Sequence, residues 1–244
     1  MDAANLNPGT SLPAMSEAVH LFFSQWEIYR LCIEHNTLCH REVGAILRQE
    51  LAGRTSPFSF LDLACGDAEL TAGALRGSLV ARYTGVDFAR PAVELAREKT
   101  SHLPCPCEFH EVDLTDFLRS NAESFDVLYL GLSHHHLECA IKREMMAHLR
   151  RATAPGGAFY MFEPCLQPGE SLDEYLERWE GSMDGLYDPF PADARSALLE
   201  HVRSCERPET REEYLASAAS AGFGPGEILF TDPDNFFSLF RFCP

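Results

Sequence analysis

Short apolar runs alternate with amphipathic segments along most of the chain. From residue 58 onward, the runs FSFLDLA, YTGVDF, CEFHEVDL, FDVLYLGL and AFYMFEP each have the length of a strand, and segments with helical spacing separate them. Runs that are apolar throughout are typical of parallel strands with both faces covered. The pattern therefore predicts an α/β fold with a doubly wound, mostly parallel sheet, in which the strands end at one shared edge.

The segments on either side of this pattern predict helices before the sheet and an antiparallel pair after it. Between residues 16 and 52, apolar side chains recur at spacings near three and four, which predicts two helices broken around Asn36. Residues 165–212 are acidic and rich in aromatic side chains, and we expect a helical cover over the substrate there. After Gly222, the sequence EILFTDPDNFFSLFRF predicts two strands joined at Asp-Pro-Asp, which complete a seven-stranded sheet.

The length of the chain fits one domain. A chain of 244 residues is too short for two ordinary domains with separate cores. Residues 1–15 show little periodicity, and we expect a mobile leader there. The single domain is expected over residues 16–244, with residues 16–52 as an N-terminal helical cap and residues 165–212 as the substrate cover.

The charge balance limits the partners of the protein. Acidic residues outnumber basic ones 37 to 20, and the formal net charge is −17. Binding to a phosphate backbone relies on clustered Lys and Arg, so nucleic acid is disfavoured as a partner. No apolar run has the length of a membrane span, and the N-terminus lacks the pattern of a signal peptide. We expect a cytoplasmic protein that acts on a small-molecule acceptor, and the oligomeric state stays open.

Nine cysteines in a chain without an export signal predict reduced thiols. In the segment SHLPCPCEFH, Cys105 and Cys107 lie between His102 and His110, a set that offers four ligands to zinc. The Cys-Pro-Cys spacing is tighter than that of common zinc sites, and the segment has the pattern of a loop that enters a strand. We therefore expect no metal site.

Acidic residues mark three successive predicted strands. Asp62 lies inside the first strand, and the turn ACGDA over residues 64–68 follows it with small residues that let the backbone approach a ligand. Asp87 ends the second strand, 21 residues after Gly66, and Asp113 ends the third. A carboxylate in the position of Asp87 can accept hydrogen bonds from both hydroxyls of a ribose. The ordered set indicates a nucleoside-binding edge.

These residues resemble the class I S-adenosylmethionine-dependent methyltransferases over roughly residues 58–164. The stretch LDLACGDA is similar to the first motif of that family, and FDVLYLGLSHHHL and LRRATAPGGAFYMFEP are similar to its fourth and fifth strand regions. The resemblance implies the Rossmann-like fold of the family and S-adenosylmethionine as cofactor. It also implies methyl transfer to an O or N atom of a small-molecule metabolite.

The resemblance further implies which residues hold the cofactor. Asp62 would orient the turn, Asp87 would bind the ribose, and Asp113 would contact the adenine. Helices that precede the sheet commonly fold over the donor in this family, which makes Tyr29 a contact to the methionyl carboxylate. The implied cofactor-binding set is Tyr29, Asp62, Ala64, Gly66, Asp87, Phe88, Asp113, Leu114, Leu130 and Gly131.

The start of the first helix distinguishes this donor from a dinucleotide. A nicotinamide-dependent oxidoreductase also has an acid at a similar distance, but it requires a glycine triplet to admit a pyrophosphate. Here Asp67 and Glu69 lie at the helix start, and two carboxylates repel a diphosphate and suit a cationic sulfonium. The chain has Ala64 and Ala68 where the methyltransferases often have glycine. An added methyl group there is tolerable if φ is negative.

Three consecutive histidines follow the fourth predicted strand, where the methyl group would meet its acceptor. Their side chains point in different directions, so they cannot bind one metal. Ser133 can cap the following helix, and His136 is expected to have a packing role. A neutral imidazole near the acceptor can remove a proton from it. The candidates for this base are His135, His134 and, on the N-terminal helices, His40.

Substrate contacts are expected from the helical cap, the end of the fifth strand and the cover. Asn36 can share a helix face with neighbouring polar residues, and Glu163 ends the fifth strand at the ligand edge. Aromatic side chains of the cover can form a stacking wall. The expected substrate-binding set is Trp26, Asn36, Glu163 and Trp179. Two alternatives remain: a noncatalytic subunit or sensor that binds S-adenosylmethionine, and a methyltransferase that acts on a basic protein.

Overall fold

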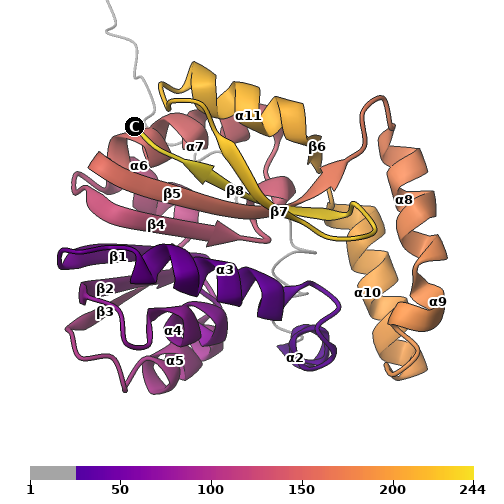
Figure 1. Ribbon diagram of the computed structural model, residues 1–244. Coiled ribbons are helices and arrows are strands. Elements are labelled where there is room, and N and C mark those ends of the chain that lie inside the picture. The colour runs from indigo at the N-terminus through magenta and orange to yellow at the C-terminus, as the bar shows by residue number, and fades with distance from the viewer. Residues whose placement is uncertain (1–25) are drawn as a thin grey trace, which may run out of the picture.

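A sheet of eight strands runs through the protein with helices on both faces (Figure 1). The computed structural model describes residues 26–244, and side chains from Ile28 onward. The strands are β1 Phe58–Leu63, β2 Val80–Asp87, β3 Cys107–Glu111, β4 Phe125–Gly131, β5 Thr153–Leu166, β6 Glu209–Thr210, β7 Glu227–Thr231 and β8 Phe237–Phe242. The helices are α2 Trp26–His35, α3 His40–Ala52, α4 Glu69–Leu75, α5 Arg90–Lys99, α6 Leu114–Ser120, the 3-10 helix η1 His134–His136, α7 Cys139–Ala152, α8 Leu172–Gly181, α9 Met183–Leu186, α10 Ala192–Cys205 and α11 Arg211–Ser220.

The strand order is β3-β2-β1-β4-β5-β8-β7, with the two-residue β6 paired to β5 outside this path. Strands β1 to β5 pair in parallel, and β8 runs antiparallel between β5 and β7. The predicted doubly wound sheet with an antiparallel C-terminal pair is therefore confirmed. The turn between β7 and β8 is closed by Asp232, whose carboxylate accepts hydrogen bonds from the N–H groups of Asp234 and Phe237.

Successive side chains of the central strands enter two separate cores. Phe60 and Tyr129 are buried on the face that α3, α4 and α5 cover, while Leu61 and Leu128 are buried on the face of α6, α7 and α11 (Figure 1). This alternation follows from the pleat of a strand, which directs neighbouring side chains to opposite faces. Because both faces are covered, each strand is apolar throughout, as the sequence pattern predicted.

The helices before the sheet meet at a left-handed turn. Asn36 has a φ of 56°, and its side-chain oxygen accepts a hydrogen bond from the N–H of Arg41. This bond caps α3, whose N-cap residue Cys39 makes no capping bond with its side chain. The predicted break around Asn36 is confirmed. The expected leader over residues 1–15 lies outside the described residues.

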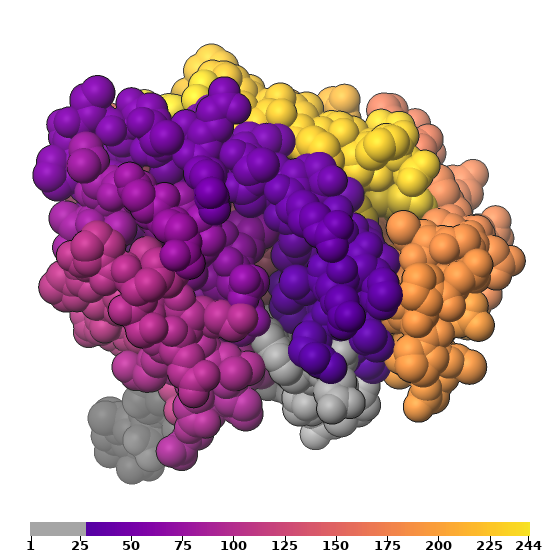
Figure 2. All heavy atoms as spheres, turned by 60° about the horizontal axis from the view of Figure 1, so that its bottom comes forward, coloured from indigo at the N-terminus to yellow at the C-terminus, as the bar shows by residue number. Residues whose placement is uncertain are grey.

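Helices α8, α9 and α10 occupy the segment between β5 and β6 that was expected to form a helical cover. Figure 2 shows this segment, in orange, directly against the indigo helices α2 and α3. The rings of His35 on α2 and Phe190 before α10 are 5.6 Å apart between centroids. The two helical segments therefore meet at the edge of the sheet where the parallel strands end.

The described part of the structure was searched for membrane-spanning helices, disulfide bonds and metal sites. Within residues 26–244, no helix is long and apolar enough to cross a membrane. All nine cysteines fall in this part of the chain, and each is a free thiol. In the same residues, no group of three or more His, Cys, Asp or Glu side chains is arranged to hold a metal ion. In the segment considered for zinc, the His102 ring bonds to the carbonyl of Lys99.

Truncation of a central core residue tests this packing. Leu128→Ala removes a fully buried side chain from β4, and we expect it to lower the free energy of unfolding by about 2–5 kcal/mol. The matched control is Leu79→Ala, because Leu79 is 47% exposed and its truncation should change stability by less than about 0.5 kcal/mol. Denaturant unfolding of both variants measures the difference. Equal losses would contradict the two-core packing.

Candidate functional site

The turn after β1 lies against the end of β2. The N–H of Gly66 donates to Oδ2 of Asp87 at 2.9 Å, and the N–H of Ala89 donates to Oδ1 of the same carboxylate at 2.8 Å. The N–H of Cys65 donates to the carbonyl of Val86 at 3.0 Å. A carboxylate oxygen has two lone pairs, so each oxygen of Asp87 can accept one further hydrogen bond. This carboxylate can therefore receive both hydroxyls of a ribose.

Three residues of this turn have left-handed backbone conformations. The φ angles are 51° at Ala64, 54° at Gly66 and 58° at Ala68. The sequence analysis made the two alanines tolerable on the condition of negative φ, and the structure does not meet that condition. A left-handed conformation costs an L-residue about 1–2 kcal/mol, so the alanines place strain in the turn where glycine would not.

Asp62 connects the strand before this turn to the neighbouring strand and to the helix after the turn. It is 1% exposed, and it accepts hydrogen bonds from the hydroxyls of Thr71 at 2.5 Å and Tyr83 at 2.6 Å. Burial raises the pKa of Asp62 to about 7 despite these two bonds. The residue therefore joins β1, β2 and α4.

The end of β3 presents an acceptor that the protein itself leaves unused. Asp113 caps α6 through Oδ1, which accepts hydrogen bonds from the N–H and the hydroxyl of Thr115. Its Oδ2 is buried and has no hydrogen-bond partner among the described residues. A buried acceptor without a partner is unfavourable, which suits it to bind a ligand donor such as the adenine amino group.

Apolar residues beside Asp113 pack as part of the core. Leu114 is buried and Phe88 is half-buried in the core on the α6 and α7 face. Leu130 is fully buried in the same core, so it supports the site from behind. Gly131 lies at the surface of the site, where an added Cβ would approach Tyr129 Oη to 2.6 Å. The small residue at this strand end therefore keeps space open.

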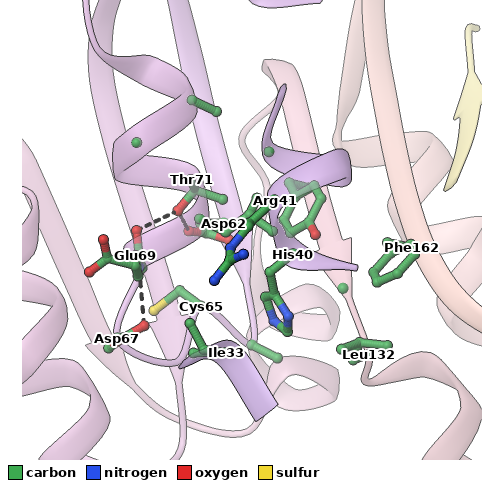
Figure 3. A pocket seen from close by; sticks show the side chains of 18 of the residues that line it. Ile33, His40, Arg41, Asp62, Cys65, Asp67, Glu69, Thr71, Leu132 and Phe162 are labelled. Carbon is green, nitrogen blue, oxygen red and sulfur yellow. Dashed lines mark hydrogen bonds between the residues drawn. The ribbon is translucent and has the colours of Figure 1, made fainter. Parts of the chain in front are cut away.

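A cavity of about 530 Å³ opens between α3, α4 and the turn after β1 (Figure 3). Its size lies within the ordinary range for small-molecule sites. Tyr29 Oη lies 3.0 Å from His40 Nε2, and both side chains line the cavity. Burial lowers the pKa of His40 to about 4, so this ring is neutral near pH 7. Asp67 and Glu69 line the opposite side, as the sequence predicted for the helix start.

A second, smaller pocket of about 50 Å³ lies beyond the first. Tyr29 and Leu132 line both, so they form the boundary between them. Helix η1 contributes His135 to the second pocket, and the expected cover contributes Trp179 from α8 and His201 from α10. The two pockets are therefore adjacent.

His135 is held between two carboxylates in this second pocket. Its Nδ1 lies 2.5 Å from Oε2 of Glu163, and its Nε2 lies 3.5 Å from Oε1 of Glu206. Burial by itself would lower the pKa of His135, but the charges of Glu206 and Glu163 outweigh burial and raise it to about 9. The ring is therefore protonated near pH 7, whereas the sequence analysis assumed a neutral imidazole.

Glu163 organises the turn that carries the histidines. It is fully buried, and its two oxygens accept hydrogen bonds from the N–H groups of Ser133, His134 and His135. These bonds satisfy the start of η1, so the predicted cap by the Ser133 side chain is wrong; its hydroxyl makes no capping bond. Glu163 lines neither pocket, and its hydrogen bonds hold the turn in place.

The family comparison agrees with this geometry. Residues 60–157 match the family model described as a methyltransferase domain. This result confirms the resemblance, and S-adenosylmethionine is the cofactor of this class of enzymes. The nicotinamide alternative is therefore set aside.

Solved structures share the fold of this chain. A complex titled DhpI–SAM–HEP is 17% identical with a TM-score of 0.63, over 96% of this chain and 100% of that one. Human N-acetylserotonin methyltransferase in complex with SAM is 16% identical with a TM-score of 0.55, over 93% and 56% of the two chains. The pyocyanin biosynthetic protein PhzM is 20% identical with a TM-score of 0.59, over 88% and 56%.

These likenesses establish the fold, since every identity is low. The chain spans little more than half the length of the human enzyme and of PhzM. No curated protein matches the chain.

Other predicted residues of the methyltransferase lie away from the second pocket. His134 is fully buried with its ring edge against Tyr214, and it lines neither pocket. Burial lowers its pKa to about 4. Asn36 caps α3, as described above, and lines neither pocket. Trp26 begins α2, and its side chain lies outside the described part of the structure.

The sequence analysis missed several residues of the two pockets, including Leu132 at their boundary and three charged or titratable side chains. Arg41 lines the larger cavity, and His201 and Glu206 line the smaller one. Glu206 follows His135 by 71 residues in the sequence, and it is one of many acids in this region. Only the folding of α10 back onto η1 distinguishes it from its neighbours. Arg41 had a detectable signal, since it follows the predicted His40 directly.

Glycine in the left-handed turn of the methyltransferase should relieve the strain. We expect Ala68→Gly to raise the free energy of unfolding by about 0.5–1 kcal/mol, because the relief of strain exceeds the added entropy of the unfolded chain. Ala216→Gly in the exposed interior of α11 is the control, and it should lower stability by about 1 kcal/mol. Thermal or denaturant unfolding measures the stability of both variants. If Ala68→Gly lowered the free energy of unfolding as much as the control does, the turn would not be strained.

Proposed function

We propose that the protein transfers a methyl group from S-adenosylmethionine to an O or N atom of a small-molecule metabolite. The main support is the shared boundary of the two pockets at Tyr29 and Leu132. A donor with its methionyl part in the larger cavity and an acceptor in the smaller pocket would meet at this boundary; Asp87 and Asp113 lie outside the lining of both pockets. The acidic charge of the chain supports the absence of a nucleic-acid partner, and the expected cytoplasmic location belongs to this proposal.

The residues at the strand ends fit the donor. Asp87 has spare lone pairs for the ribose hydroxyls, and Asp113 offers its unpartnered Oδ2 to the adenine. Gly66 and the alanines of the turn keep side chains away from the methionyl part. When bound, S-adenosylmethionine supplies the methyl group on a cationic sulfur, and the sulfur leaves as a neutral thioether. The task of the protein is alignment and removal of a proton from the acceptor.

The second pocket supports a small acceptor with an apolar body. Trp179, Leu198, Val202 and Phe237 form apolar walls, and the first three of these come from the cover helices α8 and α10. Its volume of about 50 Å³ is smaller than an ordinary metabolite, so the cover must move when an acceptor enters. Trp179 therefore remains the best candidate for direct substrate contact.

His135 is the candidate base in this proposal. Glu163 accepts a hydrogen bond from Nδ1 and so fixes the orientation of the ring, which leaves Nε2 toward Glu206 and the pocket. The two carboxylates make the ring a stronger base than an isolated imidazole, but it must first lose its own proton. His134 and His40 do not share this position: His134 is buried in the core, and His40 bonds Tyr29 beside the donor cavity.

Donor binding should depend on Asp87. We expect Asp87→Asn to weaken the binding of S-adenosylhomocysteine by about 10- to 100-fold, because an amide cannot accept from both ribose hydroxyls as a carboxylate does. Isothermal titration calorimetry measures the dissociation constant. The control Asp173→Asn changes the charge equally on the exposed face of α8 and should leave it unchanged. Tight binding of NAD, or an unchanged constant in Asp87→Asn, would contradict the proposal.

The rate of methyl transfer should rise with pH up to about 9. The pKa of His135 is raised, so the protonated ring dominates below this pH, and only the neutral ring can accept a proton. Glu206→Gln removes the larger of the two charges that raise this pKa, and we expect it to shift the rise to lower pH. The acceptor for the assay is found as a metabolite that gains the mass of one CH2 unit in a cell extract.

Replacement of the ring separates the enzyme from a sensor. His135→Asn should reduce turnover by about 10²- to 10⁴-fold with little change in the affinity for S-adenosylhomocysteine. Unchanged turnover in this variant would leave positioning as the only contribution of the pocket. If the wild-type protein binds the donor but methylates nothing in extracts, the noncatalytic alternative is correct.

A further inference from the structure

We propose that Glu206 binds a protonated amino group of the acceptor, so that the protein selects small amines with an apolar body. This inference rests on the proposed function, since it names the chemical class of the molecule that enters the second pocket. The charges, hydrogen bonds and walls of that pocket supply the observations.

Glu206 lies at the end of α10 with a carboxylate that the protein uses only in part. It is the C-cap residue of that helix, and 12% of its side chain is exposed. Its Oε1 lies 3.5 Å from Nε2 of His135, and its Oε2 accepts a hydrogen bond from the hydroxyl of Tyr175 at 3.5 Å. Both contacts are longer than the usual hydrogen-bond distance of about 2.7–3.2 Å, and a carboxylate has about four lone-pair sites. Glu206 can therefore accept closer bonds from a ligand in the pocket.

The charges around the pocket leave one negative charge in excess. Glu163 and Glu206 flank His135, whose ring carries one positive charge near pH 7. Burial lowers the pKa of His136, and it lowers that of His201 to about 4, so these two rings are neutral near pH 7. Among the described residues that line the pocket, none is Lys or Arg. An ammonium group on the ligand would supply the missing positive charge.

Lys142 does not supply this charge. It is buried outside the pocket lining, where its Nζ donates a hydrogen bond to the carbonyl of Arg207 and lies 3.9 Å from Oε2 of Glu209. The guanidinium of Arg207 pairs with Glu138 at 3.3 Å. These two cations therefore have carboxylate partners of their own, and Glu206 is left to a ligand.

The same geometry disfavours an anionic acceptor. The two N–H groups of the protonated His135 ring face Glu163 and Glu206, so the ring has no free donor for a carboxylate or a phosphate. A neutral hydroxyl can donate to Glu206, but it does not balance the charge. The end of α10 adds to the attraction for a cation, because the carbonyl end of a helix carries a partial negative charge.

The walls of the pocket fit the rest of a small amine. Trp179, Leu198 and Val202 are buried side chains of the cover that present apolar surface to it. An aromatic ring such as that of Trp179 also attracts a cation placed over its face. A bound cation would have a further effect, because its charge would offset that of Glu206 and so lower the pKa of His135. Binding of the amine would therefore favour the neutral ring that can accept a proton.

Ion exchange tests the charge of the acceptor before its identity is known. A cation-exchange resin followed by an anion-exchange resin at pH 7 divides the small molecules of a cell extract into cationic, anionic and neutral fractions. Each fraction is incubated with the full chain and S-adenosylmethionine labelled in its methyl group. We expect the cationic fraction to yield at least about 10-fold more labelled product than either of the others. An equal or larger yield from the neutral or the anionic fraction would overturn the inference.

Variants of Glu206 test the residue with the cationic acceptor isolated from that fraction. We expect Glu206→Gln to raise KM for the acceptor by about 10- to 100-fold, and Glu206→Asp, which keeps the charge, to raise it less. Glu200→Gln is the matched control, because Glu200 is exposed on the same helix and lines neither pocket, so KM should stay unchanged. Calorimetric titration with S-adenosylhomocysteine checks that the donor site of each variant is intact.

The split between KM and kcat separates acceptor binding from an effect on the base. If Glu206→Gln changed only kcat and its pH profile, Glu206 would act through His135 alone, and the inference would be wrong. An equal rise of KM in Glu200→Gln would also overturn it. If the wild-type protein binds S-adenosylhomocysteine but methylates nothing in any fraction, the proposed function itself fails, and this result is distinct from the others.

Discussion

The buried carboxylate of Glu163 determines the conformation of the turn that carries His135. Glu163 on β5 is fully buried, and an unpaired charge in that position would be strongly unfavourable. Three successive N–H groups of the turn after β4 and the ring of His135 bind it, and its pKa is lowered although burial alone would raise it. The charge of Glu163 therefore determines the conformation of the turn after β4. Any arrangement that moved the turn would leave Glu163 without its partners.

The position of this turn determines how the two pockets meet. Leu132 precedes the three amides, has a φ of 52°, and donates its N–H to the carbonyl of Phe162 at 2.7 Å. It is thus held on the boundary between the two pockets by the strand that carries Glu163. On the donor side, the bond from Gly66 to Asp87 has a comparable effect, because it pins the left-handed turn against the neighbouring strand. Both pockets are shaped by bonds between adjacent strand ends.

The residues that local sequence signals identified are those near strand ends. Asp62, Asp87 and Asp113 were predicted from acids at the ends of apolar runs, and each lies where the parallel sheet brings the ends together. Prediction was poorer where burial decides the chemistry. The sequence around the three histidines does not show that His135 lies between two carboxylates and is charged. It also does not show that His134 is buried beside Tyr214. The side chains of His134 and His135 point in different directions because the two residues occupy successive positions of the short helix η1.

By itself, the sequence determined the α/β class, the order of strands and helices, the break at Asn36 and the family of the domain. These properties follow from periodicity and from motifs that are local in the chain. Only the tertiary structure decided that Glu206 joins His135, that Arg41 reaches the donor cavity and that Ala64 and Ala68 are left-handed. The physical reason is that pKa values, cavities and strained turns depend on contacts between residues distant in the chain. The spacing of residues along the sequence does not reveal these contacts.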